Sequence, residues 1–508
     1  MGSNSSNIRI AKNTILLYGR MIISLIITLY TSRAILAILG ENDYGVYNVV
    51  GGVVVLFSFL TNAMTNSTQR FLNYSLGLND KRQLDNVFNT SILAHLTILF
   101  AVLILAETIG LWFVKTKLNI PIERQEAAMW VYHTSVIATL LNIIVIPYRA
   151  SIIATEKMEV FAYISILDVV LKLIIVLILP YFDLDRLVLY TALLAGISLL
   201  NFILYRSICR REYQFTHFRF VWDKSQYIKQ MSFSGWYLFG GVATVGAKQG
   251  TNILINIFYN VAVNAAVGVA NQVRNAVFGF VSSFQTAFNP QIVKLYASGD
   301  KDALNKLIFR SSKFSYFLLL IIALPIIAFC DEILDFWLEV VPEYAVSFTQ
   351  LVILASFTDA LSAPLWTAIG ATGRINKYQL WVSIILLLDI PIVYFVLKLG
   401  CTPVYTFYIN LIISVIAYLF RVIYIQRYIG YKLSNYCTQV IFPCMIVTIV
   451  SIIIPLLLKS YINSFISTIL YILLTLITTT LTIIILGMNK RERLFVINNI
   501  LKFKQLKG

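Results

Sequence analysis

Long apolar stretches alternate with short polar segments along almost the whole chain. Fourteen of these stretches are about 20 residues long, which is the length that an α-helix needs to cross a lipid bilayer. They predict an all-α polytopic membrane protein. The predicted spans are 13–36, 44–64, 87–113, 127–146, 161–180, 187–205, 231–256, 264–287, 314–336, 345–369, 378–397, 405–424, 440–458 and 465–486.

Two polar connections near the start of the chain resemble two later ones. Residues 80–85 (DKRQLD) follow the second predicted span, and residues 300–305 (DKDALN) follow the eighth. Pro147 opens a segment with Ala-Thr at 154–155, and Pro364 opens one with Ala-Thr at 371–372, at a constant offset of 217 residues. These matches predict an internal repeat of six spans, with the two copies entering the membrane from the same side.

The repeat predicts two six-helix lobes related by an axis along the membrane normal, with a central cavity between them. The final two spans have no counterpart in the repeat. The domain limits that we expect are 1–205 for the first lobe, 206–230 for a cytoplasmic connector, 231–430 for the second lobe, and 431–508 for the last two helices and a basic cytoplasmic tail.

The composition supports a membrane protein and explains the net charge. Of the 508 residues, 59% are hydrophobic and only 13% are charged, against roughly 25% charged residues in soluble domains. With the N-terminus inside, 29 lysines and arginines lie in inner segments, counting Arg421 at the inner end of the span 405–424 with them, and six lie in outer loops. This bias predicts that both termini are cytoplasmic. The formal charge of +16 therefore reflects topology, and we expect no nucleic acid partner.

Five cationic residues fall inside the predicted spans, where a charge costs at least about 2.5 kcal/mol. Lys172 has Asp168 one helical turn before it, so we expect an internal ion pair that also tunes the cavity. Arg33 lies close to the outer end of its span, where snorkelling to the surface and a place in the site are both open. The other three are expected to bind an anion in the cavity: Arg20, Lys248 and Arg274.

Polar residues form stripes on the first, seventh and eighth predicted spans, which open the two lobes. Such residues either line a cavity or join helices by hydrogen bonds, and for Ser, Thr and Gly the packing role is the commoner one. The cavity lining that we expect is Asn13, Ser24, Thr31, Asn252, Asn271, Asn275 and Gln285. Asp359 and Asp389 are acids within spans of the second lobe, which predicts partners for its cations or ligands for a coupling cation or proton.

Several short motifs resemble those of O-antigen-type polysaccharide flippases. They are Asn13-Thr14-Ile15, Arg33 followed by Leu39-Gly40, Asp43-Tyr44-Gly45-Val46-Tyr47, Ala154-Thr155 and Ala371-Thr372-Gly373-Arg374. That family shares an exporter superfamily with lipid II flippases and multidrug exporters, and the resemblance extends over essentially the whole chain. A count of fourteen spans is that of the lipid II branch, whereas many O-antigen flippases are described with twelve.

The resemblance implies alternating access by two lobes in a bacterial inner membrane, with an undecaprenyl-pyrophosphate-linked oligosaccharide as cargo. It also implies that cationic residues on the first and eighth helices serve the central cavity, and Arg20 and Arg274 lie on the matching helices. The implied partners are this glycan, membrane lipids and other polysaccharide-assembly proteins. We expect no cofactor and no metal.

Two other functions remain open. A multidrug exporter of the same superfamily would favour acidic residues in the first lobe, where this chain has arginines on the first span. A membrane-embedded polysaccharide polymerase or glycosyltransferase would need a large outer loop, whereas the longest outer connection here is 114–126. Since no loop carries a nucleotide, nucleophile or metal motif, we expect a transporter rather than an enzyme.

Overall fold

The computed structural model describes residues 3–55, 58–118, 120–259, 261–338, 341–458, 465–490 and 492–494. These residues form helices and turns, with no β-strand among them. Ten of the described helical segments are long and apolar enough to cross a membrane, which confirms the predicted all-α polytopic fold. The other predicted spans, 13–36, 44–64, 231–256 and 264–287, lie on further helices, so the count of fourteen spans stays a prediction.

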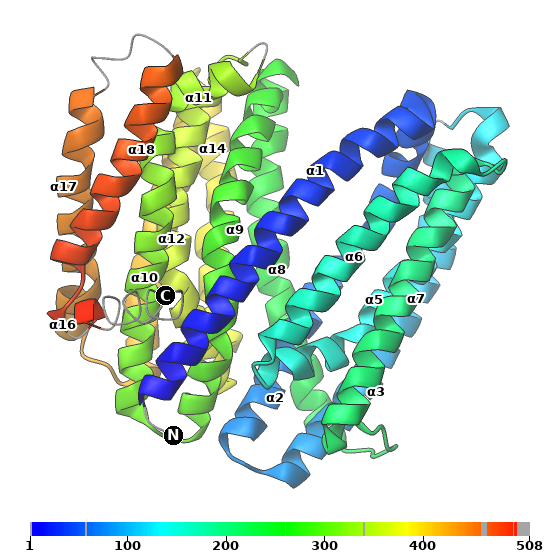
Figure 1. The fold of residues 1–508 in the computed structure, drawn as a ribbon, viewed down its shortest axis with the longest axis horizontal. Coiled ribbons are helices and arrows are strands. Elements are labelled where there is room, and N and C mark those ends of the chain that lie inside the picture. The colour runs from blue at the N-terminus through cyan, green and yellow to red at the C-terminus, as the bar shows by residue number, and fades with distance from the viewer. Residues whose placement is uncertain are drawn as a thin grey trace, which may run out of the picture. The chain divides into compact units, whose positions relative to one another are not determined.

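The chain folds into two compact units (Figure 1). Unit 1 is Met1–Val242 together with Thr286–Gly299, and unit 2 is Ala243–Gln285 together with Asp300–Gly508. The lobe limits expected from the sequence stay a prediction. Both units take part of α8 and α9, which are Lys224–Phe258 and Val261–Ala297.

The remaining helices belong to one unit each. Unit 1 contains α1 (Ser3–Val55), α2 (Ser58–Gly77), α3 (Lys81–Leu105), α4 (Leu111–Lys117), α5 (Gln125–Ala154), α6 (Met158–Ile178) and α7 (Arg186–Glu212). Unit 2 contains α10 (Lys301–Ala328), α11 (Cys330–Trp337), α12 (Ala345–Thr372), α13 (Asn376–Leu387), α14 (Asp389–Lys398), α15 (Val404–Ile429), α16 (Leu433–Tyr436), α17 (Phe442–Leu458) and α18 (Phe465–Thr482).

Gly40 divides α1 into two helices without an intervening loop. Its backbone has φ 76° and ψ 168°, a conformation that is essentially restricted to glycine. The sequence predicts two spans, 13–36 and 44–64, on either side of this residue. A single glycine therefore makes the turn between them.

A π-helical segment, Ala106–Gly110, joins α3 to α4. Such a segment disturbs the regular hydrogen-bond ladder and frees carbonyl groups. The buried Tyr132 hydroxyl of α5 donates a 2.6 Å hydrogen bond to the Ala106 carbonyl. Gly110 allows this approach, since a Cβ at that position would lie 2.3 Å from the Tyr132 oxygen.

The two pairs of similar connections also share their backbone conformation. Asn79 and Gly299 both have positive φ, and the aspartate after each of them caps the next helix by accepting a backbone N–H. Glu156 and Gly373, at the offset of 217, are likewise both left-handed. These turns agree with the internal repeat in geometry as well as in sequence.

Several helix ends differ from the predicted limits. The helices α7 and α8 extend into the expected connector 206–230, so only 213–223 lies outside the α-helices, and it contains a 3-10 turn at Gln214–Thr216. The predicted span 378–397 is broken at Leu388, because Pro391 has no N–H to donate and is best tolerated in the first turn of a new helix, α14. The predicted span 314–336 likewise divides at Phe329 into α10 and α11, four residues after Pro325.

Candidate functional site

Arg20 lies on α1 in unit 1 and is only partly buried. Its guanidinium stacks on the ring of Phe161, the start of α6, at 5.0 Å from the ring centroid. Its Nε is buried and has no hydrogen-bond partner among the described residues. An arginine has five N–H donors that suit an anion, and none of those of Arg20 is bonded to another residue that the structure describes.

Arg149 is a second cation in the same part of unit 1, and the sequence did not predict its role. The predicted span 127–146 ends before it, but α5 continues through Pro147 to Ala154. Arg149 interacts electrostatically with Tyr205 of α7, and Tyr205 interacts in turn with Arg20 and Asp168. No hydrogen bond or ion pair joins the Arg149 guanidinium to another residue that the structure describes.

Asp168 is the carboxylate of this group. It accepts hydrogen bonds of 2.7 Å from Lys172 and from the side-chain amide of Asn201. The predicted Asp168–Lys172 ion pair is therefore present. Tyr205 thus links Arg20 and Arg149 to Asp168, and Asp168 pairs with Lys172. Among the described residues, Arg20 and Arg149 have no carboxylate partner in an ion pair, which leaves two excess positive charges in this group. We call these four charged residues and Tyr205 the unit 1 cluster.

Unit 2 contains a second group of charges, on α8, α9 and α12. Arg274 donates to the Asp359 carboxylate at 2.9 Å and to the Ser356 hydroxyl at 3.0 Å. Asp359 thus pairs with a cation of its own unit, which was one of the two roles predicted for it from the sequence. Lys248 interacts electrostatically with both members of the pair and is itself exposed. This group, Lys248, Arg274 and Asp359, is the unit 2 cluster and carries one excess positive charge.

Asp389 forms no ion pair with any residue that the structure describes. It is buried at the start of α14, where the helix dipole favours a negative charge. The hydroxyl of Thr251 donates to its Oδ2 at 2.6 Å, and Asn410 also contacts it. These oxygen-rich surroundings suit a proton or a small cation.

The remaining polar residues take two kinds of position. Asn13 donates to the Glu156 carbonyl at 3.4 Å, as expected of helix packing, whereas Thr31 donates to the Ile27 carbonyl of its own helix at 2.7 Å. The side chain of Asn252 accepts a hydrogen bond from Asn264, and Ser24 is partly buried. Asn271 and Asn275 are exposed. Gln285 is buried, and its Nε2 has no hydrogen-bond partner among the described residues. The side chain of Arg33 lies outside those that the structure describes.

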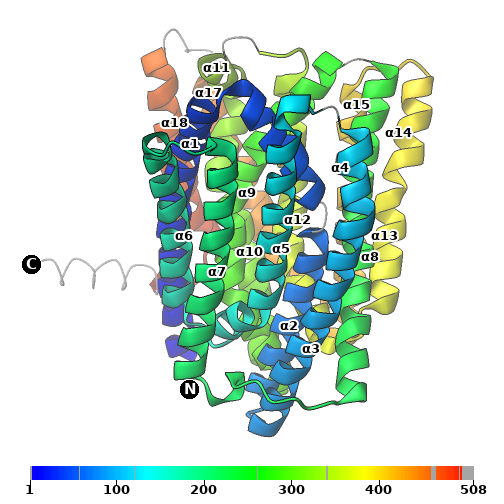
Figure 2. The same ribbon diagram turned by 90° about the vertical axis from the view of Figure 1, so that its right-hand side faces the viewer.

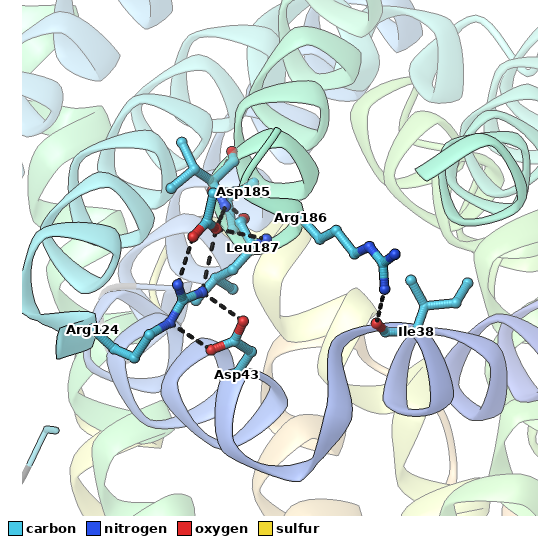
Figure 3. A network of polar contacts seen from close by, with 8 residues as sticks. Ile38, Asp43, Arg124, Asp185, Arg186 and Leu187 are labelled. Carbon is cyan, nitrogen blue, oxygen red and sulfur yellow. Dashed lines mark hydrogen bonds and ion pairs between the residues drawn. The ribbon is translucent and has the colours of Figure 1, made fainter. Parts of the chain in front are cut away.

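A separate network holds the other end of unit 1 together (Figure 3). Arg124, which the sequence placed in an outer loop, binds Asp43 of α1 through Nε and Nη2 at 2.7 Å and 2.5 Å. The same guanidinium binds Asp185, the residue before α7, at 2.5 Å. Partial burial acts to raise the pKa of Asp185, but Arg124 and the amides of Val188 and Leu187 outweigh it and hold that pKa below its usual value. The network ties three helix ends together within unit 1.

Comparison with known proteins identifies the fold. Residues 248–395 match the MatE family. No curated protein matches the chain significantly in sequence. A solved outward-facing multidrug resistance MATE family transporter of the MOP superfamily is 13% identical, with a TM-score of 0.71 over 83% of this chain and 95% of that one.

Two further structures are similar in fold. A MOP superfamily transporter from Pyrococcus furiosus, described as having a binding pocket of reverse polarity, is 12% identical, with a TM-score of 0.67 over 83% of this chain and 97% of that one. The MATE transporter ClbM, in complex with Rb⁺, is 12% identical, with a TM-score of 0.65 over 81% of this chain and 94% of that one. The chain therefore has a MATE-like transporter fold.

Proposed function

We propose that the chain is a transporter with an anionic cargo, and that this cargo is an undecaprenyl-pyrophosphate-linked oligosaccharide. It would move the glycan from the cytoplasmic to the outer leaflet by alternating access, for the synthesis of a surface polysaccharide. The MATE-like fold supports transport, since the similar structures are those of transporters. In this proposal the chain lies in a bacterial inner membrane with both termini in the cytoplasm.

The observation that carries the proposal is the excess of positive charge in both clusters. Among the residues that the structure describes, the unit 1 cluster has two cations in excess of its carboxylate, and the unit 2 cluster has one. Charges within membrane helices are costly unless they are paired, so these cations favour a negatively charged ligand. A pyrophosphate suits them well, because guanidinium groups bind phosphate oxygens in a bidentate geometry.

The rest of the cargo fits residues outside the clusters. The exposed amides of Asn271 and Asn275 on α9 can donate to sugar hydroxyls and accept from them. The lipid tail needs no protein site, because it can stay in the hydrocarbon while the polar head crosses. The chain then has to shield only the charged and sugar parts of the cargo from the bilayer.

A cation-coupled multidrug exporter is the second candidate, and two observations favour it. The MatE match covers 248–395, and a similar structure is that of a multidrug resistance transporter. Asp389, with Thr251 and Asn410 beside it, could take the coupling cation or proton in either candidate. The excess cations of the two clusters argue against a cationic drug as cargo. No comparison supports a polymerase or glycosyltransferase.

The experiment that separates the two candidates uses purified protein in proteoliposomes. Translocation of a fluorescent undecaprenyl-pyrophosphate-linked oligosaccharide is followed by its accessibility to an impermeant quencher, and efflux of ethidium is followed in parallel. The proposal expects glycan translocation above the rate of empty liposomes and no ethidium efflux. Ethidium efflux without glycan translocation would overturn it in favour of the exporter.

A further inference from the structure

The connector between α7 and α8, residues 213–223, displays large apolar side chains outside any helix. Phe218, Phe220, Val221 and Trp222 are 45%, 74%, 41% and 58% exposed. Exposed apolar residues on the long helices are explained by the hydrocarbon around them, but this connector lies beyond the helix ends (Figure 2). Four such side chains in five residues indicate a contact surface.

The connector is held in place by contacts with α3, so its exposed side chains have defined positions on the surface. Phe215 packs edge-on against Phe88 of α3, and the Thr216 side chain is fully buried. The backbone N–H of Arg219 donates to Asn89 Oδ1 at 2.6 Å. At the far end, Asn86 donates to Asp223 at 2.7 Å. All these contacts hold one face of the connector against α3 within unit 1.

In the connector and its flanks, the acidic residues have partners within the protein, whereas the exposed basic residues form no ion pairs with described residues. Both acids have internal partners, since Glu212 pairs with Lys157, and Asp223 caps α8 by accepting the Gln226 N–H at 3.0 Å. The exposed cations form no ion pair with any residue that the structure describes; they are Arg210, Arg211, Arg219, Lys224 and Lys229. The surface therefore offers unpaired positive charge next to aromatic rings.

We infer that this connector is a membrane anchor that binds anionic phospholipid headgroups on the cytoplasmic leaflet. Aromatic side chains favour the interface between headgroups and acyl chains, and each nearby Lys or Arg adds to the attraction toward an anionic leaflet. The connector joins α7, which is long and apolar enough to cross a membrane, to α8, on which the span 231–256 is predicted, so we expect it at the level of this interface. The inference uses the cytoplasmic position expected from the positive-inside bias and does not depend on the cargo.

Quenching of Trp222 fluorescence by brominated lipid tests the anchor. The protein is reconstituted in mixed phosphatidylglycerol–phosphatidylcholine vesicles in which only one of the two lipids is brominated near the headgroup. The Trp222 signal is the difference between the wild type and W222F. We expect brominated phosphatidylglycerol to quench it at least about twice as strongly as the same fraction of brominated phosphatidylcholine.

A charge variant and a matched tryptophan complete the test. In the variant R211Q/R219Q/K224Q, we expect brominated phosphatidylglycerol and brominated phosphatidylcholine to quench Trp222 to the same extent, while both still quench it. Trp130, which is exposed on α5, serves as the control through W130F and should show no preference for the anionic lipid. Equal quenching of wild-type Trp222 by both lipids would overturn the anionic preference. Quenching by aqueous acrylamide but not by brominated lipid would overturn the anchor and favour a soluble partner.

Discussion

The carboxylate of Glu156 lies 2.5 Å from the ammonium of Lys294, and its side chain is only 1% exposed. Glu156 makes the left-handed turn between α5 and α6, and Lys294 is near the end of α9, in the part that belongs to unit 1. Gln291 also donates to this carboxylate, at 2.6 Å. Gly77 of α2 lies against the same stretch of α9, since a Cβ there would be 2.7 Å from the Lys294 carbonyl. The end of α9 is thus fixed within unit 1 by charge and by close packing.

Removing one partner of this pair should destabilise the protein more than removing both charges. K294M leaves a buried carboxylate without its cation, which costs about 3 kcal/mol, and K294M/E156Q should recover most of that loss. The measurement is the thermal unfolding midpoint in detergent, with K301M at an exposed lysine as the control. A double variant as unstable as K294M would contradict a buried ion pair.

The close approach of Gly110 and Tyr132 predicts a rescue. G110A should destabilise the protein, because the new Cβ would meet the Tyr132 hydroxyl at 2.3 Å. Y132F alone loses a hydrogen bond worth about 1 kcal/mol, but it removes the clashing oxygen. We therefore expect G110A/Y132F to be more stable than G110A. G196A, at a helical glycine with open space around it, is the control and should be nearly neutral.

The Arg124–Asp185 contact predicts a loss of stability at low pH. Because the pKa of Asp185 is lower in the folded protein than its ordinary 3.8, its contribution is fully present above that value and is lost as pH falls through the folded pKa. The groups are partly exposed, so the contribution is about 1 kcal/mol or less. Unfolding midpoints of wild type and D185N between pH 3 and pH 6 should converge at the acid end. If the difference between the two unfolding midpoints stayed constant over this range, the Arg124–Asp185 contact would not be the source of that difference.

Arg274 and Asp359 should affect anion binding in opposite directions. R274Q removes donors for the cargo, whereas D359N frees the Arg274 guanidinium from its carboxylate. We expect R274Q to weaken and D359N to strengthen the binding of undecaprenyl pyrophosphate, each by roughly tenfold. Equilibrium titration in nanodiscs measures both, and S356A serves as the control for the neighbouring hydrogen bond. Loss of affinity in both charge variants would show that the pair is structural.

Hydrophobic pattern alone predicted the helices, because a bilayer demands long apolar segments with internally satisfied backbones. It also predicted the Asp168–Lys172 pair, since spacing along one helix determines that contact. The partner of Arg274 was narrowed to two acids, and only packing between α9 and α12 selected Asp359. The sequence thus predicted contacts within one helix, but it could not predict which residues pair between helices.

Arg149 and Arg421 show why part of the charge pattern was missed. Arg149 was assigned to a cytoplasmic segment, because the predicted span before it ends at 146. Arg421 lies within the predicted span 405–424, close to its inner end, and was counted with the cytoplasmic segment that follows. The structure places Arg149 in α5 and buries Arg421 in α15 over the ring of Trp366, at 5.0 Å from its centroid. Trp366 lies 217 residues after Arg149, which is the offset of the internal repeat. An alignment of the two halves would therefore have paired Arg149 with Trp366, the residue under the Arg421 guanidinium.

The central claim, that the two clusters bind an anionic cargo, is tested most directly by the affinity for undecaprenyl pyrophosphate. Wild type is compared with R20Q/R149Q/K248Q/R274Q in nanodiscs, with D168N/D359N as a control that keeps every cation and with uncharged undecaprenol as a control ligand. We predict that the four-cation variant binds the pyrophosphate at least about 100-fold more weakly, with undecaprenol binding unchanged. An affinity for undecaprenyl pyrophosphate equal to that of the wild type would contradict the account.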